Sequence, residues 1–241
     1  MKSVLLQPSY IPWRGFFHQI YMSNLFIHYD DAQYDKHGWR NRNKIRNKNG
    51  ELWLTIPVLS KGNVDNNLLI KDVRINNSTN WAKKHWQTIE QSYSKTMFFD
   101  KYSSSLKAFF DSPPELLVDF VIPLTEHISS LLNITHVKFL RSSTLDCSGN
   151  KTEKIVNILK NVESNYYISG PSAKVYMDEN LLAENNITVQ YIDYMYRDYP
   201  SLFGHTSSSL SIIDLLFIMG PLTNQFIWGS KPDNENEILV A

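Results

Sequence analysis

The first 29 residues carry the pattern that most restricts how this chain can fold. A short β-prone run, Ser3–Leu6, ends at Gln7-Pro8, and Gly15–Met22 has apolar side chains at helical spacing. A second apolar run, Leu25–Tyr29, ends at Asp30-Asp31. A strand–helix–strand unit of this length is close to the minimum for a right-handed crossover between two parallel strands. The pattern therefore predicts a parallel sheet.

Later segments repeat this alternation of strands and helices. Strands are expected at Leu52–Val58, Val137–Leu140, Tyr166–Ile168 and Ile187–Ile192, and helices at Trp81–Tyr93, Ser103–Phe110, Pro113–Leu132, Lys151–Asn161 and Leu210–Met219. Ser112 is expected to cap the helix that follows it, with Pro113 at its first position, and Asn41–Gly50 is interpreted as a basic, turn-rich loop. The order predicts an α/β protein with a mainly parallel sheet, helices on both faces and a Rossmann-like, nucleotidylyltransferase-like three-layer architecture. We expect one domain over residues 1–241, with residues 80–132 as a helical insertion or second lobe.

Charge and composition limit the partners of this chain. Its 24 Lys and Arg residues balance 24 Asp and Glu residues, so no net field attracts nucleic acid or a membrane surface. Residues 35–81 are locally basic, which suits an anionic small ligand. A single cysteine, Cys147, excludes an intramolecular disulfide and a cysteine-based zinc site. The N-terminus lacks a signal-peptide run, and the apolar run Ile212–Met219 is shorter than the ~20 residues of a membrane span. We expect a soluble, cytoplasmic protein.

Polar and aromatic residues follow the first predicted strand, at the sheet edge where ligands bind in open α/β folds. The loop Gln7–Phe17 is stiffened by two prolines, and Gly15 allows close helix packing or close approach of a ligand. Free N–H groups at the helix start favour an anion such as phosphate. Tyr10 and Trp13 could stack on a base or a sugar. The alternative is a rigid loop whose aromatic side chains only cover the core.

A second polar segment follows the second predicted strand. Asp30 and Asp31 could hold a metal ion, accept a proton or bind a ribose, and only one would face the site if the strand continued through them. Four basic residues, suited to phosphate, would share one face of an extended segment: Arg40, Arg42, Lys44 and Arg46. Trp39, Asn41 and Asn43 would share the other. The alternative is a solvated basic loop, and we favour a binding function.

Other candidates are weaker. His85 is kept as a catalytic candidate, although a lone helical histidine is more often structural, and no histidine has metal-ligand spacing. No metal site is predicted. Ser169 and Gly170 follow a predicted strand at the ligand-binding edge. The helix start Ser148–Glu153 could receive a phosphate or be only a well-capped helix start. Asp214, inside an apolar helix, is interpreted as a structural hydrogen-bond anchor rather than a site residue.

Several of these motifs resemble the WbqC-like family. They are Gln7-Pro8-x-Tyr10-x-Pro12-Trp13-x-Gly15-Phe16-Phe17, Asp30-Asp31-x-Gln33-Tyr34, Trp39-x-Asn41-Arg42-Asn43 and Trp53-Leu54-Thr55-Ile56-Pro57-Val58. The likeness continues nearly to the end of the chain. It implies a place among the proteins of bacterial surface polysaccharides, such as the O-antigen of lipopolysaccharide, and a cytoplasmic step in making a modified sugar. Several such sugars carry a glycyl or other acyl group in amide linkage on a 4-amino-4,6-dideoxyhexose.

A weaker likeness concerns shape. The strand–loop–helix order is similar to that of the nucleotidylyltransferase and pantothenate synthetase superfamily, which carries His-x-Gly-His where this chain has Trp13-Arg14-Gly15-Phe16. Both histidines are replaced, so that superfamily's way of stabilising phosphates does not carry over. Arg14, Arg42 or Lys44 are candidate replacements.

Three functions remain open. The first is acyl or aminoacyl transfer to a nucleotide-linked amino sugar, expected to be of the dTDP type, with Asp30 or Asp31 as general base. The second is nucleotidyl transfer or ligation with ATP and Mg²⁺, and the third is nucleotide-sugar binding without catalysis. The ligand-site segments are residues 7–57 and 148–177, and a homodimer stays open. The catalytic candidates are Asp30, Asp31 and His85, and the binding candidates are Gln7, Tyr10, Trp13, Gly15, Gln33, Tyr34, Trp39, Asn41, Arg42, Asn43, Lys44, Ser169 and Gly170.

Overall fold

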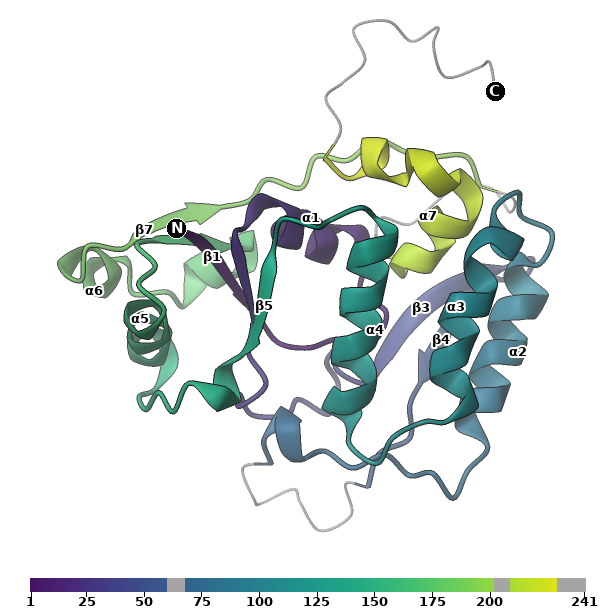
Figure 1. The fold of residues 1–241 in the computed structure, drawn as a ribbon, viewed down its shortest axis with the longest axis horizontal. Helices are drawn as coiled ribbons and strands as arrows, with labels where there is room; N and C mark the ends of the chain where they lie inside the picture. The colour runs from purple at the N-terminus through teal and green to yellow at the C-terminus, as the bar shows by residue number, and fades with distance from the viewer. Residues whose placement is uncertain (60–67, 202–208, 229–241) are drawn as a thin grey trace, which may run out of the picture.

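The fold is built around a central parallel sheet. The structure is a computed structural model, and it describes residues 1–59, 68–201 and 209–228. The strand order is β5-β2-β1-β6-β7 (Figure 1). The strands are β1 Lys2–Leu6, β2 Leu25–His28, β5 Lys138–Arg141, β6 Tyr166–Ser169 and β7 Thr188–Tyr191. The chain builds outward from β1 through β2 to β5, then returns to build β6 and β7 on the other side. This order confirms the predicted α/β class and its Rossmann-like architecture.

Helices cover both faces of the sheet, because alternate side chains of each strand point to opposite sides. Val4 and Phe26 belong to the larger core, which includes α1, α2, α3, α4 and α7, whereas Leu5 and Ile27 belong to a second core with α5 and α6. Figure 1 shows α5 and α6 on the left and α2, α3 and α4 on the right. The helices are α1 Arg14–Met22, α2 Trp81–Tyr93, α3 Phe99–Asp111, α4 Leu117–Leu131, α5 Lys151–Asn161, α6 Glu179–Glu184 and α7 Ile212–Met219. The short 3₁₀ helices are Ile70–Asp72, Ser142–Thr144, Pro171–Val175 and Gly220–Phe226.

The prediction of a turn-rich loop at Asn41–Gly50 is wrong. Strand β3 (Arg42–Asn47) pairs antiparallel with β4 (Gly50–Thr55) in a separate hairpin with a two-residue turn. Gly50 has φ +111°, which a side chain would disfavour. Asn43 and Ile45 are buried while Arg42 and Lys44 are partly exposed. This alternation is the signal of a strand, but the polar composition hid it.

The predicted start of α4 is also wrong. The helix begins at Leu117 rather than Pro113, and its N-cap is Leu116, without a side-chain cap. The Leu117 N–H donates to the Val73 carbonyl, and the Ile75 N–H donates to the Glu115 carbonyl. The backbone before α4 is therefore extended, because it pairs with a segment far away in sequence. Among the described helices, none has both the length and the apolar character needed to cross a bilayer.

Candidate functional site

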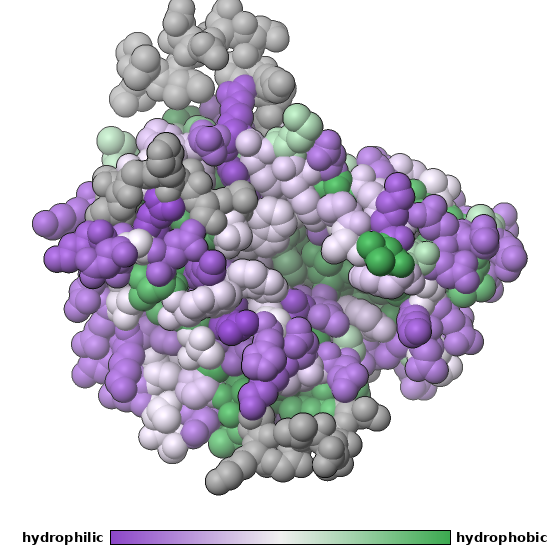
Figure 2. Space-filling model, turned by 180° about the vertical axis from the view of Figure 1, so that it is seen from behind, coloured by the Kyte–Doolittle hydropathy of each residue, from purple (hydrophilic) through white to green (hydrophobic). Residues whose placement is uncertain are grey.

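A cavity of about 1050 Å³ opens at the carboxyl ends of β1 and β6. These two strands are neighbours, but the chain leaves β1 toward β2 and leaves β6 toward β7, on the opposite side. Connections that diverge in this way leave a crevice, which is where open α/β sheets bind ligands. In Figure 2 a hollow near the centre of the face has green and pale side chains on its floor. The cavity is therefore the candidate site.

Six predicted binding residues line this cavity: Gln7, Trp13, Trp39, Asn43, Ser169 and Gly170. Further lining residues were not predicted individually. Gln19, Tyr29 and Tyr167 lie within the predicted ligand-site segments, whereas Tyr194 and Ser209 lie outside them. Tyr194 and Ser209 lie far from the N-terminal motifs in sequence. No local signal could have found them, because folding alone brings them to the sheet edge.

One wall is built around Gly15. A Cβ atom at this position would lie 2.3 Å from Cζ2 of Trp13, so only glycine leaves room for the indole ring. The ring packs edge-on against Tyr194, with centroids 4.9 Å apart. Gln19 Nε2 donates a hydrogen bond of 2.5 Å to the Tyr194 hydroxyl. Gly15 thus shapes the cavity through Trp13 and is not itself among the described lining residues.

The loop before that wall is held in a strained shape. Ile11 has φ +40°, a conformation that β-branched residues rarely adopt. The buried Nδ2 of Asn43 donates to the carbonyls of Tyr10, at 3.1 Å, and Ile11, at 2.7 Å. The Ile212 N–H donates to the Pro12 carbonyl at 2.8 Å. Asn43 therefore positions the loop as well as lining the cavity.

Tyr10 and His85 lie in the core instead of the cavity. Tyr10 is fully buried, and its hydroxyl pairs with Nδ1 of His85 at 2.9 Å. Burial lowers the pKa of His85 to about 4, so the imidazole is neutral near pH 7. In this structure the side chains of Tyr10 and His85 do not line the cavity, so Tyr10 does not offer its ring to a ligand there and His85 does not face one there.

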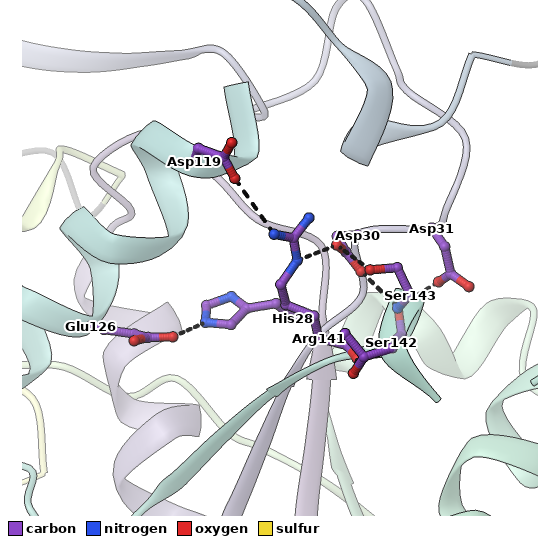
Figure 3. Close-up of polar contacts among 9 residues, drawn as sticks. His28, Asp30, Asp31, Asp119, Glu126, Arg141, Ser142 and Ser143 are labelled. Carbon is purple, nitrogen blue, oxygen red and sulfur yellow. Dashed lines mark hydrogen bonds and ion pairs between the residues drawn. The ribbon is translucent and has the colours of Figure 1, made fainter. Parts of the chain in front are cut away.

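Asp30 is the centre of a polar cluster at the carboxyl ends of β2 and β5 (Figure 3). Its carboxylate is fully buried and accepts hydrogen bonds from Arg141 Nε at 2.7 Å and from the N–H and hydroxyl of Ser143 at 2.9 and 2.8 Å. Burial alone would raise the pKa of Asp30, but these bonds and the guanidinium charge outweigh it and lower the pKa. Such a carboxylate is a weak base, and its contacts are those of a structural ion pair.

Asp31 belongs to the same cluster. Strand β2 ends before the two aspartates, so the expected alternation of faces does not apply, and both carboxylates contact the Ser142 hydroxyl. Lys154 on α5 pairs with Asp31 at 2.6 Å. A Mg²⁺ ion would have to displace Arg141 and Lys154 from the two aspartates, so the pair fits a metal poorly. Among the described residues, no group of three or more potential metal ligands occurs.

The remaining predicted residues lie outside the cavity lining. Asn41 Nδ2 donates to the Ile56 carbonyl, Gln33 forms an isolated bridge with Leu69, and the Tyr34 N–H donates to the Leu68 carbonyl. The cations of Arg42 and Lys44 lie 4.5 and 5.2 Å from the centre of the Trp53 ring. Arg14 points into the interior and donates to the carbonyls of Arg197 and Phe226. Arg14, Arg42 and Lys44 therefore lie outside the described cavity lining, and a phosphate contact by any of them stays a prediction.

Two cations line the cavity. Arg40 donates to the Gln7 carbonyl at 3.2 Å, and Lys151 is the first residue of α5. Burial lowers the pKa of Arg40 to about 10, which leaves the guanidinium charged near pH 7. Among the described lining residues there is no carboxylate and no imidazole. The site is thus aromatic, polar and locally positive.

Comparison with known proteins assigns this architecture to a family. The model of the WbqC-like protein family matches residues 7–225. The chain belongs to this family. A curated relative is the uncharacterized protein Rv1507c of Mycobacterium tuberculosis (strain ATCC 25618 / H37Rv), which is 37% identical over 221 residues, covering 91% of this chain and 94% of that protein. No solved structure matches the chain. The family resemblance noted in the sequence is confirmed, and the matched residues include every described lining residue from Gln7 to Ser209.

Proposed function

We propose that this protein is an enzyme of surface-polysaccharide sugar biosynthesis that transfers an acyl or aminoacyl group, such as glycyl, to the amine of a nucleotide-linked amino-deoxy sugar. The observation that carries the proposal is the cavity at the point where the β1 and β6 connections diverge. Its volume of about 1050 Å³ is at the upper end of the roughly 300–1000 Å³ of small-molecule sites. It therefore has room for two reactants side by side, which removes much of the entropic barrier to their reaction.

The lining suits a sugar joined to a nucleoside. Trp13, Trp39 and Tyr194 offer ring faces, and Ser169 and Gln7 offer hydrogen-bonding groups. Aromatic rings stack on bases and on the apolar faces of sugars, whereas hydroxyl and amide groups fix orientation.

Within this proposal, Asp31 rather than Asp30 accepts the proton that the sugar ammonium loses before it attacks. The amine then forms the amide bond with the acyl carbon of an activated donor, and the bond to the donor's thiolate or phosphate leaving group breaks. Asp31 keeps 12% exposure of its side chain, whereas Asp30 is fully buried. Burial and the nearby charge of Asp31 raise the pKa of Tyr29, which lines the cavity, to about 12. Asp31 therefore lies close to the cavity wall.

The test is to incubate the protein with dTDP-4-amino-4,6-dideoxyglucose, glycine, ATP and Mg²⁺, and to measure product mass. A glycyl amide is expected, and release of pyrophosphate or ADP would make the reaction ATP-driven ligation. Asp31→Asn should slow turnover, whereas Asp119→Asn, an exposed carboxylate of the same cluster, should not. Absence of adduct with free glycine and with a glycyl thioester would refute glycyl transfer, and absence of adduct with acetyl and other acyl thioesters as well would refute transferase activity.

A second candidate is nucleotide-sugar binding without catalysis. It is favoured by one observation, namely that the described lining contains no carboxylate, imidazole or thiol. It predicts saturable binding of the sugar nucleotide and no turnover with any acyl donor.

A further inference from the structure

The described lining of the cavity carries positive charge without a carboxylate beside it. Arg40 and Lys151 are the charged side chains among its described lining residues, and no carboxylate accompanies them. The whole chain has a formal net charge of zero, so this charge is a local feature. The two cations come from different parts of the fold, one from the loop before β3 and one from the start of α5.

Arg40 is poorly satisfied within the protein. One N–H reaches the Gln7 carbonyl at 3.2 Å, but its buried Nε has no hydrogen-bond partner among the described residues. Asp35 and Tyr34 are near enough to favour the charged guanidinium, yet burial still dominates and lowers its pKa. None of the ion pairs found in the described parts of the chain includes Arg40. Burying such a cation without a full set of partners is unfavourable, and an anionic ligand would supply them.

Lys151 completes the arrangement from α5. Its neighbours are already engaged, because Lys154 pairs with Asp31 and the helix N-terminus is capped by Asn150 and Glu153. The capped backbone leaves the Lys151 side chain as the anion-binding group of this helix start. In contrast, Lys44, a basic residue outside the lining, pairs with Glu51 at 2.9 Å.

We infer that Arg40 and Lys151 together bind the diphosphate of a nucleoside diphosphate group in this cavity. An arginine can donate two parallel N–H bonds to one phosphate, and lysine acts as a compact charge on the other. Because the two cations come from different elements, each can contact one of the two phosphates of a diphosphate. Trp39, which adjoins Arg40 and lines the cavity with a side chain that is 40% exposed, is placed to stack on the base. The inference rests on the proposed function, because it names the ligand group that anchors the substrate.

The test measures binding of dTDP, dTMP, thymidine and inorganic pyrophosphate by calorimetry, without any acyl donor. Arg40→Gln and Lys151→Gln should each weaken dTDP binding roughly 10- to 100-fold, the range expected for a lost charged hydrogen bond. Thymidine binding should stay unchanged, and added salt should weaken dTDP binding but not thymidine binding. The matched control, Arg74→Gln, removes an exposed charge that pairs with Glu115 outside the cavity, and it should leave dTDP binding unchanged.

Folding is checked separately. Arg40→Gln should unfold at the same temperature as the wild type or higher, because the buried Nε of the unliganded guanidinium has no hydrogen-bond partner among the described residues. A lower unfolding temperature together with weaker thymidine binding would identify Arg40 as structural and overturn the inference. Arg40→Lys keeps the charge and should bind dTDP with intermediate affinity.

Two further outcomes would also overturn it: dTDP that binds no better than thymidine, or cavity variants that bind dTDP like the wild type. The failure of this inference can be distinguished from the failure of the proposed function. If dTDP binding depends on both cations but no acyl transfer occurs, the diphosphate site stands and the transferase proposal fails.

Discussion

Replacing Asp30 by Asn tests whether this carboxylate is structural or catalytic. The substitution keeps the size and shape of the side chain and removes its charge. The amide oxygen can still accept from the Ser143 N–H and the Ser142 hydroxyl, which contact Oδ1 at 2.9 and 3.2 Å. The amide NH₂ would then occupy the place of Oδ2, where Arg141 Nε donates at 2.7 Å. Two donors would face each other there.

The expected cost follows from these contacts. One charge-assisted hydrogen bond is lost, which is worth about 1.5–3 kcal/mol. Breaking a fully buried ion pair costs about 3–5 kcal/mol. The Arg141 side chain is 35% exposed and can turn toward water. The loss of unfolding free energy should therefore be smaller than the cost of breaking a fully buried ion pair. We expect Asp30→Asn to lower the free energy of unfolding by about 2–3 kcal/mol, or to lower the melting temperature by roughly 4–12 °C for a domain of this size.

The assay is urea unfolding followed by circular dichroism at several pH values. The pKa of Asp30 is lower in the folded protein than in the unfolded chain, so its contribution is present above the unfolded pKa of about 3.9 and is lost as pH falls through the folded pKa. The difference between wild type and variant should be full near pH 7 and should shrink below about pH 4. Asp119→Asn is the control, because Asp119 contacts Arg141 at 3.5 Å but is 48% exposed, and it should change stability by less than about 0.5 kcal/mol. A stable Asp30→Asn variant that has lost turnover would refute the structural assignment.

Two other substitutions test the cavity wall and the core. Gly15→Ala should displace the Trp13 ring, because the new Cβ would lie 2.3 Å from its Cζ2. We expect altered tryptophan fluorescence and weaker ligand binding. If both stay unchanged, the role assigned to Gly15 in the cavity wall is wrong. His85 should make the protein less stable in acid. Burial lowers the pKa of His85 to about 4 in the folded protein, whereas its pKa in the unfolded chain is about 6.5. As the pH falls below about 6.5, the unfolded chain therefore binds a proton that the folded protein does not bind. Stability should therefore fall by up to roughly 3 kcal/mol between pH 6.5 and 4 in the wild type. His85→Gln should lose less over this interval, and equal acid sensitivity of the two proteins would assign the effect to other groups.

The N-terminal part of the fold follows from local sequence. The runs at Ser3–Leu6, Gly15–Met22 and Leu25–Tyr29 have the apolar spacing of strand, helix and strand, and the structure has these elements nearly in place. The helix between the two strands predicts that they are parallel, so their carboxyl ends lie at the same edge of the sheet. Ligands bind at that edge in open α/β sheets, so the sequence also located the ligand-binding edge.

Local pattern failed at two places, one where polar composition hid a strand and one where pairing with a distant segment decided the backbone. β3 and β4 are a hairpin whose polar strand resembles a loop, and the residues before α4 stay extended because they pair with Val73 and Ile75. Hydrogen bonds to a distant segment outweigh a favourable helix start, since capping contributes only about 1 kcal/mol.

The sequence determined which residue types meet at the edge of the sheet, because strand order and loop position fix that neighbourhood. Only the tertiary structure decided which of them face the cavity. Tyr10 and Trp13 lie three positions apart in one stiff loop, yet one is in the core and the other on the cavity wall. Arg40 lines the cavity, whereas Arg42 lies over Trp53. The physical reason is that the direction of a side chain in a loop depends on backbone angles such as φ +40° at Ile11, which are set by contacts with Asn43 and α7 that local sequence does not contain.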